Sequence, residues 1–160
     1  MGKLISTLDE RVILDNGKSQ TTSNNVTIDD VGQFSRRLDT IETTFEASGI
    51  EILRFTESEQ TQTAGSFVKG DVRYIRISNL TECNVDLYFI KDNEESTIFK
   101  LDGEKTMMLA NGLFNASSTS DYVVEGYVDP SYYGDLVGID SIKAKAYPSA
   151  SQLEIVVASK

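Results

Sequence analysis

Apolar and polar side chains alternate along most of the hydrophobic segments of this chain, and the alternation limits the folds that it can adopt. Residues 72–78 carry Arg73 and Arg76 between apolar neighbours, and residues 142–147 carry two lysines in the same way. A repeat of two residues sends successive side chains to opposite faces of a β-strand, whereas a helix needs apolar side chains three or four positions apart. The pattern therefore predicts strands.

Polar, turn-forming segments separate the predicted strands from one another. The strands expected from the alternation are residues 38–45, 51–56, 72–78, 85–90, 97–101, 106–109, 142–147 and 153–158. The Asp102-Gly103 pair is among the stronger short cues for a tight hairpin. Residues 72–109 are therefore expected to form a meander, in which each strand pairs with the next.

Many short strands joined by polar turns are typical of an all-β protein. We expect a β-sandwich or a jelly-roll-like barrel with an extended N-terminal arm and at most one short helix. The helix would correspond to residues 28–38, where the apolar spacing is roughly helical. A chain of 160 residues is long enough to bury a sizeable core, so the fold needs neither a metal ion nor the disulfide that its single cysteine, Cys83, cannot form.

Residues 1–25 differ from the rest of the chain. The short apolar group 12–14 is followed by the polar stretch 19–25, and such a segment buries too little apolar surface to fold alone. We expect residues 1–25 to form an arm that packs against something else, such as a neighbouring subunit, and residues 26–160 to form a single β domain. The alternative is an edge strand of that domain, joined to it by a loose loop.

The charge of the chain bears on its partners. With 25 acidic and 15 basic residues the formal net charge is −10, and a surface this acidic repels phosphate backbones. We therefore expect no nucleic-acid binding. The apolar runs are too short to span a bilayer, and the N-terminus lacks the apolar segment of a signal peptide. No membrane partner is expected, and the protein is expected to assemble in a cytoplasm.

The absence of histidine removes most common enzyme mechanisms. Neither a Ser-His-Asp nor a Cys-His arrangement can form, and one thiol cannot supply the ligands of a structural zinc ion. The glycine-rich motifs that bind phosphates do not occur either. We therefore expect a non-enzymatic protein without catalytic residues, cofactor or metal.

Two weaker alternatives involve acidic residues. A carboxylate pair can hydrolyse a glycoside, and the candidates are Asp129, Asp135 and Asp140, near Tyr127, Tyr132 and Tyr133. The same tyrosines, within residues 122–133, could stack on sugars in a carbohydrate-binding module. Residues 92–95 could hold calcium through oxygen ligands. We interpret the segment with the aspartates and tyrosines as an ordinary acidic loop between strands. We interpret residues 92–95 as a solvated hairpin tip.

Three segments together resemble a known group of proteins. They are LISTLDERVILD at residues 4–15, FSRR at residues 34–37 and DVRYIRISNL at residues 71–80. All three are similar to segments of small virion structural proteins of marine and cyanobacterial tailed phages. The shared motifs are structural rather than catalytic, and the resemblance extends over most of the chain.

The resemblance implies a β-rich subunit of the phage particle, with the capsid decoration (cement) type as the leading interpretation. Such a protein would lie on the capsid surface and clamp adjacent subunits of the major capsid protein. It would also associate with itself, with a trimer favoured. A head–tail connector, a tail structural subunit and a carbohydrate-binding β-sandwich module are the alternatives.

Contacts with partners are expected mainly from the arm. The predicted contact residues are Leu4, Ile5, Leu8, Arg11, Val12, Ile13 and Leu14, with Arg36 and Arg37 as charged anchors. For the two arginines, local pairing with Asp29, Asp30 or Asp39 is an equally good interpretation.

Overall fold

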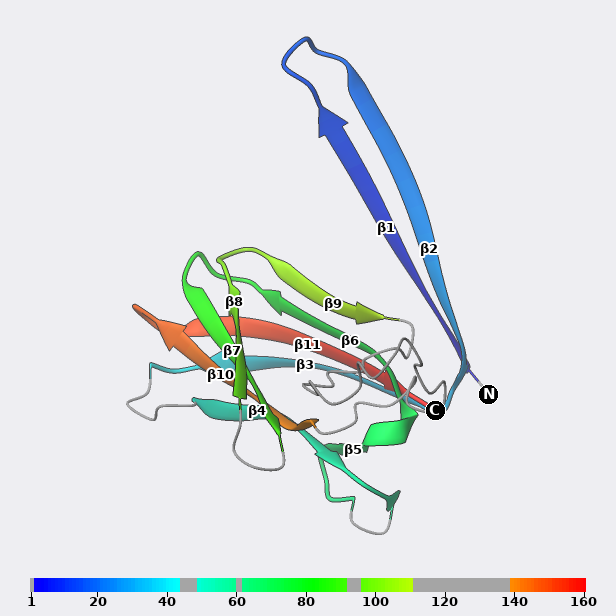
Figure 1. The fold of residues 1–160 in the computed structure, drawn as a ribbon, viewed down its shortest axis with the longest axis vertical. Helices are drawn as coiled ribbons and strands as arrows, with labels where there is room; N and C mark the ends of the chain where they lie inside the picture. Colours follow the sequence, from blue (N-terminus) through cyan, green and yellow to red (C-terminus); the bar gives the residue numbers. More distant parts are fainter. Residues whose placement is uncertain (1, 44–48, 60–61, 92–95, 111–138) are drawn as a thin grey trace, which may run out of the picture.

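Two β-sheets packed together form the body of the protein, and a two-stranded hairpin extends from it (Figure 1). The computed structural model describes residues 2–43, 49–59, 62–91, 96–110 and 139–160. The hairpin consists of β1 (Gly2–Ile13) and β2 (Ser19–Val31). The four-stranded sheet has the order β3 (Gln33–Ile41), β11 (Ser151–Ser159), β6 (Val72–Asn79) and β9 (Thr106–Ala110). The five-stranded sheet has the order β5 (Ser66–Val68), β4 (Ile50–Thr56), β10 (Ile139–Tyr147), β7 (Asn84–Lys91) and β8 (Ser96–Leu101).

The predicted all-β fold is confirmed, and the sheets form a sandwich rather than a closed barrel in the described ranges. Among the described strands, the pairings are antiparallel except for the parallel pair β4 and β5. The short helix expected at residues 28–38 does not form. Its first residues complete the hairpin in β2, and its last residues pair with β11 in β3. Lys69–Asp71 form a 3-10 turn, η2.

The expected meander over residues 72–109 is wrong, although its strands form close to where they were predicted. β7 does pair with β8, but β6 pairs with β11 and β9 in the other sheet. β8 and β9 also lie in different sheets, as do β3 and β4. The connecting loops therefore carry the chain over the end of the sandwich instead of closing hairpins. Alternation does not distinguish a meander within one sheet from strands that pass between two sheets, because each strand has one apolar face in either arrangement.

The core lies between the sheets and is lined by the apolar face of each strand. Ile77 of β6 and Leu153 of β11 project from the four-stranded sheet, and both are fully buried. They belong to one cluster with Leu87 of β7 and Ile142 of β10, which project from the five-stranded sheet. Burial of this apolar surface is the main favourable contribution to folding.

A buried asparagine joins the loops that pass between the sheets. The side-chain amide of Asn79, which is 2% exposed, donates to the carbonyl oxygens of Cys83 at 2.6 Å and Asp102 at 3.3 Å. Its oxygen accepts hydrogen bonds from the hydroxyls of Ser151 at 2.8 Å and Thr81 at 3.0 Å. These partners lie in or beside the β6–β7, β8–β9 and β10–β11 connections. One side chain therefore links these three connections between the sheets.

Gly103 lies in the β8–β9 loop, at the same end of the sandwich. A Cβ atom at this position would lie 2.3 Å from the carbonyl oxygen of Glu82, which is far inside van der Waals contact. The backbone of Glu104, next to it, donates to the carbonyl oxygen of Thr81 at 2.9 Å. The glycine that suggested a hairpin is therefore explained by the close approach of two crossing loops.

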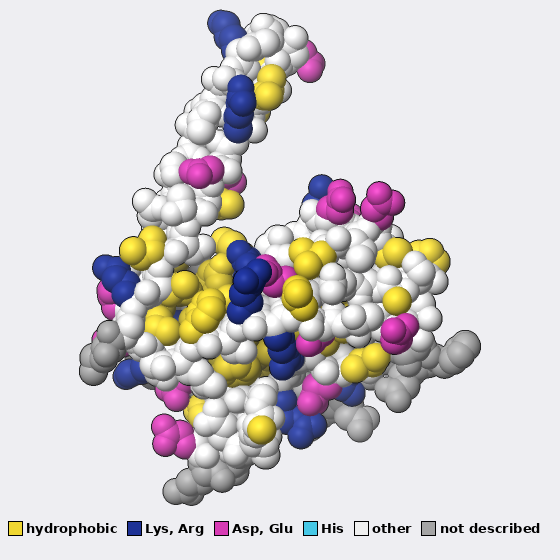
Figure 2. Space-filling model, turned by 180° about the vertical axis from the view of Figure 1, so that it is seen from behind, with side chains coloured by type: hydrophobic (Ala, Val, Ile, Leu, Met, Phe, Trp, Pro, Cys, Tyr) yellow, Lys and Arg dark blue, Asp and Glu magenta, His cyan; other side chains and the backbone are white. Residues whose placement is uncertain are grey.

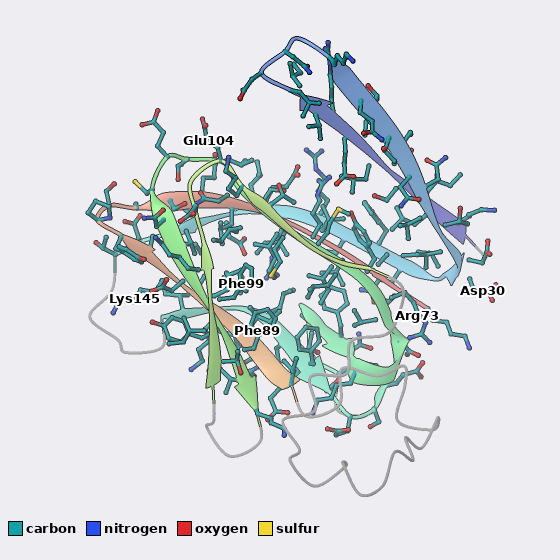
Figure 3. The ribbon with its side chains drawn as sticks, turned by 45° about the horizontal axis from the view of Figure 1, so that its top comes forward. Asp30, Arg73, Phe89, Phe99, Glu104 and Lys145 are labelled. Atoms are coloured by element: carbon teal, nitrogen blue, oxygen red, sulfur yellow. The ribbon has the colours of Figure 1, made fainter. Side chains whose placement is uncertain are left out.

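The hairpin arm leaves the sandwich at a β-bulge. Gly2 pairs with Val31 and Leu4 pairs with Ile28, so one residue of β1 faces two residues of β2. Asp30, inside the bulge, has a φ of 60°, a left-handed conformation that aspartate tolerates better than most residues. Figure 3 shows Asp30 at the foot of the hairpin. Because bulges bend and twist a strand, this one sets the direction of the arm.

The end of the arm predicted at residue 25 falls within β2. The polar stretch 19–25 is not a loop but pairs along its whole length with residues 7–13 of β1. The hairpin therefore continues to Val31, where the bulge brings it onto the sandwich.

We expect replacement of Asn79 by alanine to destabilise the sandwich. The change leaves buried polar groups of three loops without partners, which costs on the order of 3 kcal/mol of unfolding free energy. Urea unfolding of Asn79→Ala beside Asn24→Ala, an exposed change in β2, measures the effect. Equal stability of the two variants would contradict the role assigned to Asn79.

Candidate protein-binding site

The two faces of the hairpin differ in what they contact. The register places Leu4 opposite Ile28, Ser6 opposite Val26 and Leu8 opposite Asn24. Even-numbered residues of β1 therefore share one face, here called the inner arm face, with their partners on β2. Residues 5, 7, 9, 11 and 13 lie on the outer arm face.

Near the sandwich, the inner arm face packs on the four-stranded sheet. Ile28 is 6% exposed and forms a cluster with Tyr74, Val156 and Ala158, which lie on the side of that sheet away from the main core. Leu4, which was predicted as a contact residue, packs against the same cluster. Half of the arm is therefore anchored within its own chain, and the apolar burial fixes the angle at which the rest extends.

Beyond this contact, the apolar residues of the arm are exposed. Leu8 is 43% and Val12 is 56% exposed on the inner arm face. Ile5 and Ile13 are exposed on the outer arm face, together with Arg11, and Leu14 is exposed in the turn. Figure 2 shows hydrophobic side chains gathered where the arm meets the sandwich and others along the arm. Most residues of the predicted contact set therefore lie together on one projecting element.

A second group of exposed apolar residues lies on β3, an edge strand of the four-stranded sheet. Phe34 is 55% and Leu38 is 57% exposed. They pair with Ala158 and Glu154 of β11, so they share the outer surface of the sheet with the arm contact. Large exposed apolar groups that lie close together are a mark of protein-binding surfaces. Phe34 and Leu38 were absent from the predicted contact set, although their alternation with Arg36 was visible in the sequence.

Charged residues lie between these apolar groups. The Arg36 Nε donates to the Glu154 carboxylate at 2.7 Å, and Arg76 donates to the other oxygen of Glu154. The Glu154 side chain is 12% exposed. The hydrogen bond from Arg36 lowers the pKa of Glu154 below its ordinary value of 4.5, outweighing the burial that raises it. Arg36 thus pairs with a residue that the sequence did not suggest.

Arg37 points to the opposite face of β3, so the two arginines do not act together. Its Nε forms an ion pair with Asp39 at 3.0 Å, which is one of the local pairings that the sequence allows. Arg37 also lines a shallow polar pocket with Glu51, Arg54 and Ser66. Arg54 is paired with Glu51 at 2.9 Å, which leaves the pocket without a strong net charge.

Of the residues suggested for glycoside hydrolysis, sugar binding or calcium binding, Asp140 lies in the part of the chain that the structure describes. Asp140, one of the three candidate carboxylates, forms an ion pair at 2.7 Å with Lys69. Burial lowers the pKa of Lys69, but hydrogen bonds to Asp140 and Glu57 outweigh it and raise the pKa overall. Asp129, Asp135, the tyrosine segment 122–133 and the acidic segment 92–95 lie outside the described residues.

Among the residues that the structure describes, no group of three or more acidic residues, Cys or His is placed to hold a metal ion. No helix in the same part of the chain is long and apolar enough to cross a membrane.

Comparison of the chain with protein-family models, curated proteins and solved structures finds no match.

The ion pairs of Glu154 lead us to expect a specific loss of stability in acid. A carboxyl group whose pKa is lowered by folding stabilises the protein above its ordinary value, about 4.5, and loses this contribution as the pH falls through the folded-state pKa. Glu154→Gln is expected to lower the unfolding free energy by about 2 kcal/mol at neutral pH. The difference should shrink as the pH falls, as measured by urea unfolding over a pH series. A difference that is independent of pH would contradict this assignment.

Proposed function

We propose that this protein is a non-enzymatic structural subunit of a tailed-phage particle, of the capsid decoration (cement) type. In this role the hairpin arm binds neighbouring subunits, including the major capsid protein, at the capsid surface. The observation that carries the proposal is the arm itself: its base is anchored in the sandwich, and its outer half exposes Leu8, Val12 and Ile13.

The anchored base supports a binding role because it pre-organises the arm. A hairpin of two strands is marginally stable in water by itself. Here the cluster around Ile28 and Tyr74 holds one half against the sheet. A partner that binds the exposed half then has less conformational entropy to remove, which favours association.

The strand edges of the arm offer a second type of contact. β1 and β2 pair only with each other among the described strands, so each has an edge at which a partner strand could add. Strand addition uses main-chain hydrogen bonds for affinity and alternate side chains for specificity. Repeated over a lattice, many weak contacts of this kind stabilise a shell through multivalency.

The assignment to a phage particle rests on the resemblance of residues 4–15, 34–37 and 71–80 to small virion proteins. Two of these segments form the surfaces described above: residues 4–15 make up most of β1 and its turn, and residues 34–37 lie in β3. The net charge of −10 is consistent with an outer surface that keeps particles apart.

We expect that shortening the arm abolishes attachment to the capsid without unfolding the sandwich. In the variant, residues 9–23 are replaced by Asn-Gly, a pair that favours two-residue hairpin turns, so that Leu8 and Asn24 close the hairpin. Co-sedimentation with purified heads that lack this protein measures attachment, and urea unfolding measures stability. The unfolding free energy should change by less than about 1 kcal/mol, because the anchored base is kept.

A variant with Thr21→Ser and Thr22→Ser provides the control, since it preserves the length and apolar surface of the arm. Attachment that survives shortening would refute a binding role for the arm. Attachment of the intact protein to tails or to the portal vertex, and not to the capsid lattice, would favour the connector or tail role instead.

A further inference from the structure

Two exposed strips of this protein have matching patterns. On the inner arm face, beyond the anchored base, alternate positions of β1 carry Leu8, Glu10 and Val12. Alternate positions on the same side of a strand lie about 6.8 Å apart. The strip therefore presents an apolar, an acidic and an apolar side chain in a straight row.

The complementary row lies on β3. Phe34, Arg36 and Leu38 occupy alternate positions on the outer surface of the four-stranded sheet. This row has the same spacing, with a basic side chain between two apolar ones. The Arg36 side chain is 65% exposed although it binds Glu154, and a guanidinium has donors on three nitrogens. A carboxylate from another molecule can therefore reach it.

The arm of the same chain leaves the β3 row uncovered. Its base packs on Tyr74, Val156 and Ala158, and its outer half extends beyond the sandwich (Figure 1). Phe34 and Leu38 consequently remain more than half exposed. The covered part of the sheet and the β3 row are nonetheless one continuous surface, since Ala158 pairs with Phe34.

We infer that the β3 row binds the arm of a second copy of this chain. Leu8 and Val12 of one copy pack on Phe34 and Leu38 of the other, and Glu10 lies against Arg36. The contact extends the packing that the arm base already makes on its own sheet. This inference rests on the proposed function as an assembly subunit and names one of its partners.

A second copy is favoured over an unrelated protein because both halves of the contact belong to the same chain. Each copy offers one arm and one β3 row, so contacts can close into a dimer or a trimer in which all rows are covered. Apolar burial drives the association, while the exposed pair of Glu10 and Arg36 mainly sets the register and adds salt dependence.

Sedimentation equilibrium of purified variants tests the inference. The intact protein is expected to form a dimer or trimer, and both Leu8→Ser/Val12→Ser and Phe34→Ser/Leu38→Ser are expected to be monomers. An equimolar mixture of these two variants should regain association, since one keeps the β3 row and the other keeps the arm. Glu10→Arg should raise the dissociation constant at least about tenfold, because it places two like charges together.

The matched control is Ile50→Ser/Ile98→Ser, which removes exposed apolar side chains from the five-stranded sheet and leaves the arm and the β3 row unchanged. This variant should associate like the intact protein. An intact protein that is monomeric at all concentrations overturns the inference, as does equal loss of association in the control. An intact protein that is monomeric and still attaches to heads overturns the inference but not the proposed function. An intact protein that is oligomeric but attaches to nothing on the particle does the reverse.

Discussion

The side chain of Asn79 links three of the loops that carry the chain between the two sheets. The chain crosses between the sheets at three neighbouring loops, and the Asn79 side chain binds groups in or beside all of them. Its amide group can do this because the nitrogen donates two hydrogen bonds while the oxygen accepts others. The close approach at Gly103 depends on the same loops being held together.

This arrangement also determines where the surface features lie. Because β6 and β11 are neighbours in the four-stranded sheet, Tyr74 and Val156 come together on its outer side. They provide the apolar base for the arm, which the bulge at Asp30 directs over them. β3 becomes an edge strand beside this base. The exposed arm and the exposed row on β3 thus result from one topology.

Exposed apolar residues are costly for a protein that acts alone, since they promote association. In this molecule many of them lie on the arm, whose base is anchored, and on β3, and charged side chains lie between them. Such a surface can bind a partner through shape, apolar area and charge. These exposed surfaces are the basis on which we propose adhesion between subunits.

The sequence by itself determined the class of the fold and the positions of most strands, because alternation is a local property that reports which faces are apolar. It also indicated the apolar residues of the arm from Leu4 to Leu14. It did not determine the partners of the strands: residues 72–109 read equally well as a meander or as strands crossing between sheets. Nor did it show that the polar residues 19–25 form a strand or that Arg36 binds Glu154. These features were decided only in the tertiary structure, because pairing brings together residues far apart in the chain, and no local pattern records which of them meet.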